Sequence, residues 1–292
     1  MSRSFPFDWV DAFTDTPFGG NGCAVVHDGG AVDVETCLKY TRETGLVECT
    51  FVGPSDLADA KVRYFFPTME IPFAGHPTIA SVASLLSRGV VKGPSLTLET
   101  GAGVVPIEVS PDGLITMTQN APVFGDEVSP GLIARLSGLS DDDIIGQPQV
   151  VSTGLPFCIV ALKSHDALRK ATLDLDVLPE FQKGLTVNGV QVMEPYFVAL
   201  GGATDAGDSF GRLLLAPPSP PEDPFTGSAT GCAASYLWKH GLIDRPRYVA
   251  QQGHDLGRPG QAQVEVLGPR DAISGVKVSG QGRIVMAGEV HF

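Results

Sequence analysis

One acidic residue, Glu48, has neighbours that suit proton chemistry. It lies between the apolar Val47 and Phe51, with only Cys49 and Thr50 near it. Burial among such residues raises the pKa of a carboxyl group, as a general acid–base group requires. Alternation along a strand is equally compatible with Glu48 on the solvent face, so both interpretations remain open.

A second candidate, His76, stands directly before Pro77, where we expect a helix to begin. The positive end of a helix lowers the pKa of a nearby imidazole, which favours a neutral ring that can relay protons near pH 7. A single histidine is also a common surface or core residue. The helix start next to Gly75 is what favours the functional interpretation.

Asp223 and Ser228 flank Gly227 in a similar turn. Taken singly, Asp223 fits a turn residue before Pro224, and Ser228 or Thr226 fits a cap at the start of a helix. A functional interpretation of these residues depends on the structural elements in which they lie.

Those elements form an internal repeat. Residues 70–89 align without a gap on residues 222–241, at a shift of 152 positions. Both segments turn through proline and glycine into a run of small and apolar residues, which is typical of a helix buried on most sides. The identical pairs are Glu70/Glu222, Pro72/Pro224, Phe73/Phe225, Gly75/Gly227, Thr78/Thr230, Leu85/Leu237 and Gly89/Gly241.

In each half, the repeat places a helix start after a strand, which leaves backbone N–H groups without intrahelical partners. If the halves face each other, the two helix starts converge on one cleft near Gly75 and Gly227. They would hold a carboxylate there, each contributing about 0.3–2 kcal/mol. The alternative is a pair of ordinary, well-capped core helices.

The pattern of short strands with one long buried helix per half predicts an α+β fold, in which a barrel-like sheet wraps around each helix. Helices are too few for a βαβ fold. We expect two pseudo-symmetric domains, residues 1–121 and 122–282, with a linker at 120–125 and the last strand, about 283–292, returning to the first. Shorter helices are expected at 34–44, 130–136 and 141–145.

Composition narrows the class of protein. The chain has 292 residues and a formal net charge of −13, which argues against nucleic acid or an anionic membrane as partner. We expect no signal peptide and no membrane span, because no suitable apolar run occurs. Five scattered cysteines predict neither disulfides nor a zinc site, and favour the cytoplasm. The six histidines show no ligand spacing, so we expect no metal.

Five motifs occur in an order that resembles the phenazine biosynthesis PhzF-like family, over nearly the whole chain. They are GGNGCAVV (19–26), VECTFV (47–52), GHPT (75–78), EDPFTGSA (222–229) and QGHDLGRPG (252–260). The resemblance implies a diaminopimelate epimerase-like fold with the site between two similar domains. It also implies a homodimer that needs neither cofactor nor metal.

The resemblance further implies a function, a cofactor-independent isomerase that moves a proton within a small carboxylated substrate, such as a cyclic amino acid. Glu48 would carry the proton between carbons, while His76, Asp223 and Ser228 would bind and polarise the substrate. Backbone amides at Gly75, Gly227 and Ser228 would hold its carboxylate. The motifs also assign Asn21, Thr226 and Arg258 to substrate binding.

This chain departs from the family beside the acid, where Val47 and Cys49 replace the usual Ser and Thr. Two other interpretations therefore remain. One is a small-carboxylate-binding protein that does not catalyse. The other is an epimerase or racemase with two cysteines, but the repeat places Ala74 and Thr226 at the positions such thiols would occupy.

Overall fold

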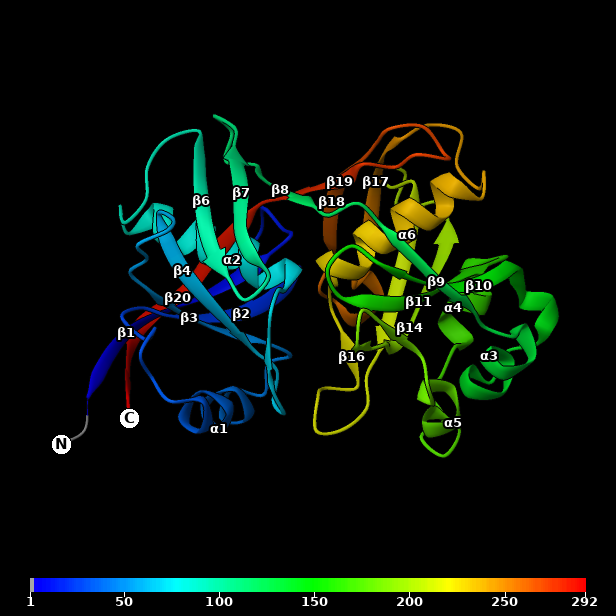
Figure 1. Cartoon of the computed structure of the whole chain (residues 1–292), viewed down its shortest axis with the longest axis horizontal. Coiled ribbons are helices and arrows are strands. Elements are labelled where there is room, and N and C mark those ends of the chain that lie inside the picture. Colours follow the sequence, from blue (N-terminus) through cyan, green and yellow to red (C-terminus); the bar gives the residue numbers. More distant parts are fainter. Residues whose placement is uncertain (1–2) are drawn as a thin grey trace.

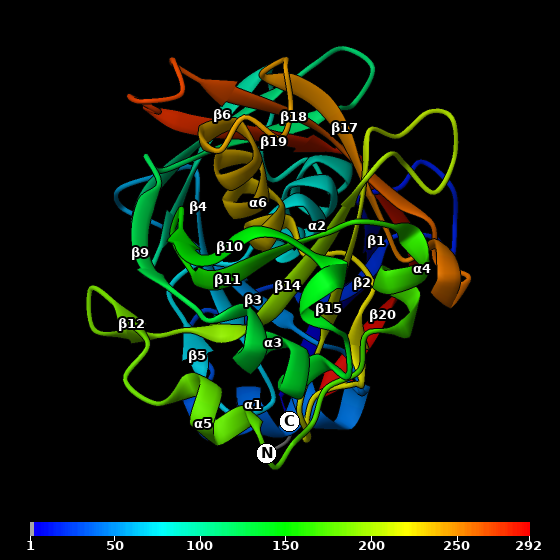
Figure 2. The same ribbon diagram turned by 90° about the vertical axis from the view of Figure 1, so that its right-hand side faces the viewer.

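The computed structural model describes residues 3–292. Two groups of strands lie side by side, and one long helix crosses each group (Figure 1). These helices are α2 (Gly75–Ser87) and α6 (Gly227–Lys239), 13 residues each. In the view turned by 90° the two helices overlap, with strands on both sides of them (Figure 2).

The first group precedes residue 120. Its elements are β1 (Ser4–Ala12), β2 (Asn21–Val26), α1 (Val34–Thr44), β3 (Cys49–Gly53), β4 (Ala60–Phe65), β5 (Glu70–Ile71), α2, β6 (Ser95–Thr100), β7 (Gly103–Val109) and β8 (Ile115–Gln119).

The second group follows. Its strands are β9 (Val123–Glu127), β10 (Ile144–Ser152), β11 (Pro156–Leu162), β12 (Thr186–Val187), β13 (Val190–Gln191), β14 (Met193–Leu200), β15 (Ser209–Leu214), β16 (Glu222–Asp223), β17 (Arg247–Gln252), β18 (Gly260–Leu267) and β19 (Gly275–Gly280). Its helices are α3 (Pro130–Ser137), α4 (His165–Lys170), α5 (Leu178–Gln182) and α6, with 3-10 turns at Asp141–Asp143 and His254–Leu256. The last strand, β20 (Gly282–His291), returns to the first group.

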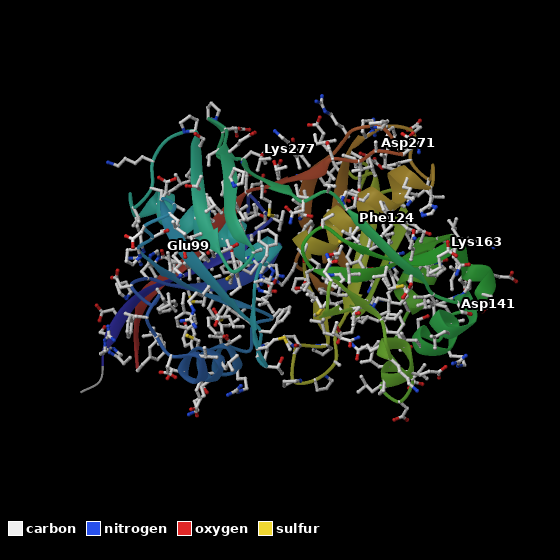
Figure 3. The ribbon with its side chains drawn as sticks, in the orientation of Figure 1. Glu99, Phe124, Asp141, Lys163, Asp271 and Lys277 are labelled. Carbon is white, nitrogen blue, oxygen red and sulfur yellow. The ribbon has the colours of Figure 1, made fainter. Side chains whose placement is uncertain are left out.

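Eighteen of these strands form one mixed sheet, and β12 and β13 form a separate pair, so the barrel-like sheets expected around the two helices are joined to each other. The two groups join where β8 pairs antiparallel with β19. Each group thereby satisfies the backbone hydrogen bonds of the other's edge strand. Lys277 of β19, labelled at this junction in Figure 3, also forms an ion pair with Glu108 of β7 at 3.1 Å. The last strand, β20, pairs antiparallel with β1.

Both long helices are buried because small and apolar residues occupy nearly every position. In α2 the side chains of Ile79, Val82 and Leu85 are fully buried, and α2 packs on β1, β2 and β20. In α6 the side chains of Ala234 and Leu237 are fully buried, and α6 packs on β11, β18 and β19. A helix without a polar face needs such enclosure.

The predictions of the shorter helices were partly correct. The helix expected at 34–44 is confirmed as α1, where the Asp33 carboxylate accepts from the Thr36 backbone N–H and Gly45, at φ 66°, ends the helix. The helix expected at 141–145 is wrong, because only a 3-10 turn forms at Asp141–Asp143. Ile144 and Ile145 instead pair with β11. The expected linker also ends early, since β9 begins at Val123 and pairs with β10.

The repeated acids Glu70 and Glu222 have a structural role. Each binds an arginine of the preceding strand through two hydrogen bonds, Glu70 with Arg63 at 2.8 and 2.9 Å, and Glu222 with Arg212 at 2.9 and 2.7 Å. Such bidentate ion pairs hold the two side chains in a defined relative orientation. The same device therefore fixes the strand turn that leads into each long helix.

Candidate active site

The two long helices meet at their first residues. A Cβ atom on Gly75 would lie 2.5 Å from the backbone nitrogen of Ser228 and 2.8 Å from Cα of Gly227. A Cβ atom on Gly227 would lie 2.7 Å from Cζ of Phe13. Any side chain would therefore push the helix starts apart, and this contact explains both repeated glycines.

Neither helix start is capped by a side chain. The residue before α2 is Ala74, and Thr226, which precedes α6, makes no cap hydrogen bond. The predicted Thr226 cap is therefore wrong, because its hydroxyl donates to Oδ2 of Asp223 at 2.6 Å. Buried helix starts without caps leave backbone N–H groups free for a ligand.

A cavity lies where the helix starts meet, with about 310 Å³ of space between its lining atoms. The cavity is narrow, so its walls must part to admit a ligand. Its polar lining consists of Glu48, Gly75, His76, Asp223, Thr226, Gly227 and Ser228, and its apolar lining of Val47, Phe66, Leu155, Phe157, Met193, Leu213 and Leu215.

Glu48 and His76 form a buried pair at this cavity. Oε2 of Glu48 lies 3.1 Å from Nδ1 of His76, and the two residues are 6% and 2% exposed. Burial raises the pKa of the Glu48 carboxyl well above its usual range, and the nearby Asp223 carboxylate adds to this effect. Burial lowers the pKa of His76 to about 3, and the positive charge of Arg258 acts in the same direction.

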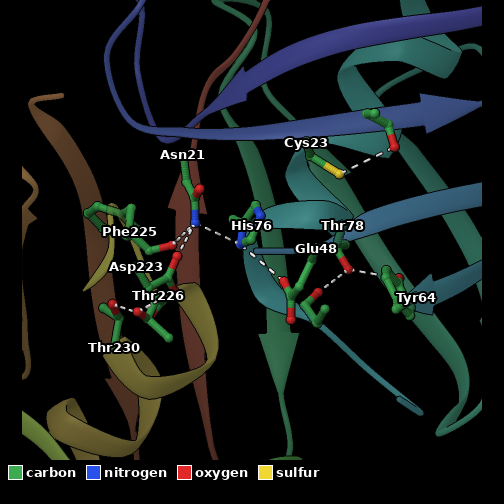
Figure 4. Close-up of polar contacts among 12 residues, drawn as sticks. Asn21, Cys23, Glu48, Tyr64, His76, Thr78, Asp223, Phe225, Thr226 and Thr230 are labelled. Carbon is green, nitrogen blue, oxygen red and sulfur yellow. Dashed lines mark hydrogen bonds and ion pairs between the residues drawn. The ribbon is translucent and has the colours of Figure 1, made fainter. Parts of the chain in front are cut away.

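The imidazole is therefore neutral near pH 7. Asn21 lies between His76 and Asp223, with Glu48 beyond the imidazole (Figure 4). Its amide nitrogen is 2.5 Å from Oδ1 of Asp223, 2.9 Å from the Phe225 carbonyl oxygen and 3.0 Å from Nδ1 of His76. An amide has two N–H groups, and the two oxygens can accept both. Nδ1 is then left to share its proton with Glu48.

Asp223 is held on both carboxylate oxygens, by Asn21 and by Thr226. Burial nevertheless raises the pKa of Asp223 to about 6. Gln252, fully buried, binds this segment through Nε2, which donates to the Asp223 carbonyl at 2.7 Å, and through Oε1, which accepts from the Thr226 backbone N–H at 3.0 Å. The sequence analysis did not single out Gln252, although it opens the QGHDLGRPG motif.

Ser228 lies in the first turn of α6 and lines the cavity. Its hydroxyl makes no hydrogen bond to any residue between positions 3 and 292, so it is free to bind a ligand.

Two predicted site residues lie behind the cavity. Asn21 orients Asp223 from outside the lining. The Arg258 guanidinium donates to Oδ1 of the buried Asp11 at 2.7 Å and to the carbonyl oxygens of Gly19 and Gly20 at 2.9 Å. It thereby fixes the loop before Asn21, and substrate contact by Arg258 stays a prediction.

All five cysteines are buried, and none of them lines the cavity. Within residues 3–292, no three His, Cys, Asp or Glu side chains are grouped so as to hold a metal ion. In the described part of the chain, no helix is both long enough and apolar enough to cross a membrane.

Comparison with known proteins places the chain in one family. The family model described as phenazine biosynthesis-like protein, PhzC-PhzF, matches residues 10–288. An uncharacterized isomerase of Bacillus subtilis, YfhB, is 31% identical over 94% of both chains. The trans-2,3-dihydro-3-hydroxyanthranilate isomerase of Pseudomonas aeruginosa is 29% identical over 97% of this chain and 98% of its own.

Comparison with solved structures supports the same family. The Bacillus anthracis phenazine biosynthesis protein of the PhzF family superimposes with a TM-score of 0.84, at 28% identity and over 99% of each chain. The chain therefore belongs to the PhzC-PhzF phenazine biosynthesis-like family, whose members named above include isomerases.

Proposed function

We propose that the protein is an isomerase that moves a proton between carbon atoms of a small carboxylated substrate, with Glu48 as the acid–base group. The observation that carries this proposal is the buried Glu48–His76 pair beside two uncapped helix starts. Relatives named isomerases over nearly the full length support the reaction class.

The raised pKa of Glu48 suits both halves of such a reaction. A carboxylate whose pKa lies nearer to neutral pH is a stronger base than an exposed one, and its acid form still releases the proton readily. Glu48 would take the proton from one carbon and return it to another. Acid–base help of this kind contributes about 10²–10⁴-fold to the rate.

The helix starts and Ser228 would stabilise the negative charge that develops on the substrate. Free backbone N–H groups at Gly75 and Gly227 would hold the substrate carboxylate, and they would stabilise the electron pair left on the substrate after proton removal. The neutral His76 would keep the Glu48 carboxylate in place by donating from Nδ1. Asp223, with both oxygens already bound, would orient the substrate rather than move its proton.

The test is proton exchange with solvent. Two probes are suitable, trans-2,3-dihydro-3-hydroxyanthranilate and cyclohexa-2,5-diene-1-carboxylate, whose C1–H is activated by the carboxylate and two double bonds. In D2O, the wild-type protein should replace the activated hydrogen of at least one probe, as followed by proton NMR.

Glu48→Gln should abolish this exchange and leave binding intact. The matched control is Glu194→Gln, because Glu194 is also buried, at 8% exposure, but does not line the cavity. Persistent exchange in Glu48→Gln would refute the role of Glu48. Binding without exchange in the wild type would instead identify a binding protein.

A further inference from the structure

The cavity is lined by one set of polar side chains and one set of apolar side chains. The hydrogen-bonding side chains of its lining belong to Glu48, His76, Asp223, Thr226 and Ser228. The rest of the lining is hydrocarbon or thioether, from Val47, Phe66, Leu155, Phe157, Met193, Leu213 and Leu215. A ligand group that faces these apolar residues finds no side-chain hydrogen-bond partner among them.

No cation is available for a second anionic group either. Across residues 3–292, no lysine or arginine lines the cavity. Arg258, whose charge acts on His76, is already paired with Asp11, and Arg212 and Arg63 are paired with Glu222 and Glu70. The only ionisable acids in the lining, Glu48 and Asp223, would repel a second anion.

We propose that the substrate is a small monocarboxylate whose body, beyond the carboxylate and the reacting carbons, is hydrocarbon. This inference rests on the proposed function, because it takes the helix starts as the carboxylate site. The cavity is narrow, which favours a small ligand. Burying a hydroxyl without a partner weakens binding, and burying an unpaired carboxylate weakens it further.

Calorimetric titration with four benzoates tests this selectivity. Benzoate, 4-methylbenzoate, 4-hydroxybenzoate and terephthalate share one ring and one carboxylate, and they differ only at the far end of the ring. We expect 4-methylbenzoate to bind at least as tightly as benzoate, and 4-hydroxybenzoate to bind about tenfold or more weakly. Terephthalate should bind weakest of all.

The inference is overturned if 4-hydroxybenzoate or terephthalate binds as tightly as 4-methylbenzoate. It is also overturned if none of the four binds at about 10 mM, since a monocarboxylate with a hydrocarbon body should fit best. These probes carry no exchangeable C–H group. Selectivity can therefore hold while Glu48 exchange fails, or fail while exchange holds.

A variant pair assigns the selectivity to the apolar wall. Met193 lines the cavity and is only partly buried, so Met193→Gln adds a polar group of similar shape with little risk to folding. It should narrow the preference for 4-methylbenzoate over 4-hydroxybenzoate. Met286→Gln is the matched control, because Met286 is 52% exposed on β20, and it should leave the ratio unchanged. An unchanged ratio in Met193→Gln would overturn the role of this wall.

Discussion

The substitution Asp223→Asn should remove a loss of stability that the wild type shows as the pH rises toward neutrality. Burial raises the pKa of the Asp223 carboxyl from its ordinary 3.8 to about 6. A group whose pKa is raised by folding favours the folded state while it is protonated. The free energy of unfolding therefore falls as the pH rises from 3.8 through about 6. The difference of about 2 between the two pKa values corresponds to about 3 kcal/mol.

The Asp223→Asn variant has no carboxyl group that could titrate at this position. Urea unfolding, followed by fluorescence, gives the free energy of unfolding of both proteins. The difference between Asp223→Asn and the wild type should shift in favour of the variant by about 2 kcal/mol from about pH 4.5 to pH 8. The exposed Asp205→Asn is the control, and its curve should run parallel to that of the wild type. A constant difference between Asp223→Asn and the wild type over this range would refute the buried, proton-binding state of Asp223.

Three further predictions follow from the site. Gly75→Ala should destabilise the protein by about 3 kcal/mol in urea unfolding, because its Cβ atom would meet Ser228 N at 2.5 Å; a neutral effect would contradict the packing of the helix starts. Ser228→Ala should change stability by less than about 0.5 kcal/mol but lower turnover of an exchanging probe by about 10²-fold; unchanged turnover would exclude a ligand contact. The pH profile of turnover should fall as the pH drops through a range above that of ordinary glutamates, because Glu48 must lose its proton and burial raises its pKa; a profile set near pH 4 would contradict this.

The helix starts were predictable because the turn residues are local. Gly75 and Gly227 share a position in the repeat, and the structure brings them into backbone contact. The apolar neighbours of Glu48 were compatible with a buried acid and with the solvent face of a strand, and the structure buries it. The roles of these residues in catalysis stay predictions.

Other features depend on contacts between distant segments. The pairing of β8 with β19 joins residues 115–119 to 276–280, and no local pattern encodes that choice. The Thr226 hydroxyl could cap α6 or bind Asp223, and only the folded turn decides between them. Arg258 likewise finds Asp11 from the opposite end of the chain. Gln252 gave no signal apart from its place in a motif, because a buried glutamine is recognised only by its partners.

The central claim, that Glu48 carries the proton, is tested most directly by one NMR measurement. It follows the C1–H signal of cyclohexa-2,5-diene-1-carboxylate in D2O with wild-type, Glu48→Gln and Glu194→Gln proteins. The account predicts loss of the signal with the wild type and Glu194→Gln, and a signal that persists with Glu48→Gln. Equal loss of the signal with Glu48→Gln, or no loss with wild-type protein saturated by the probe, would contradict it.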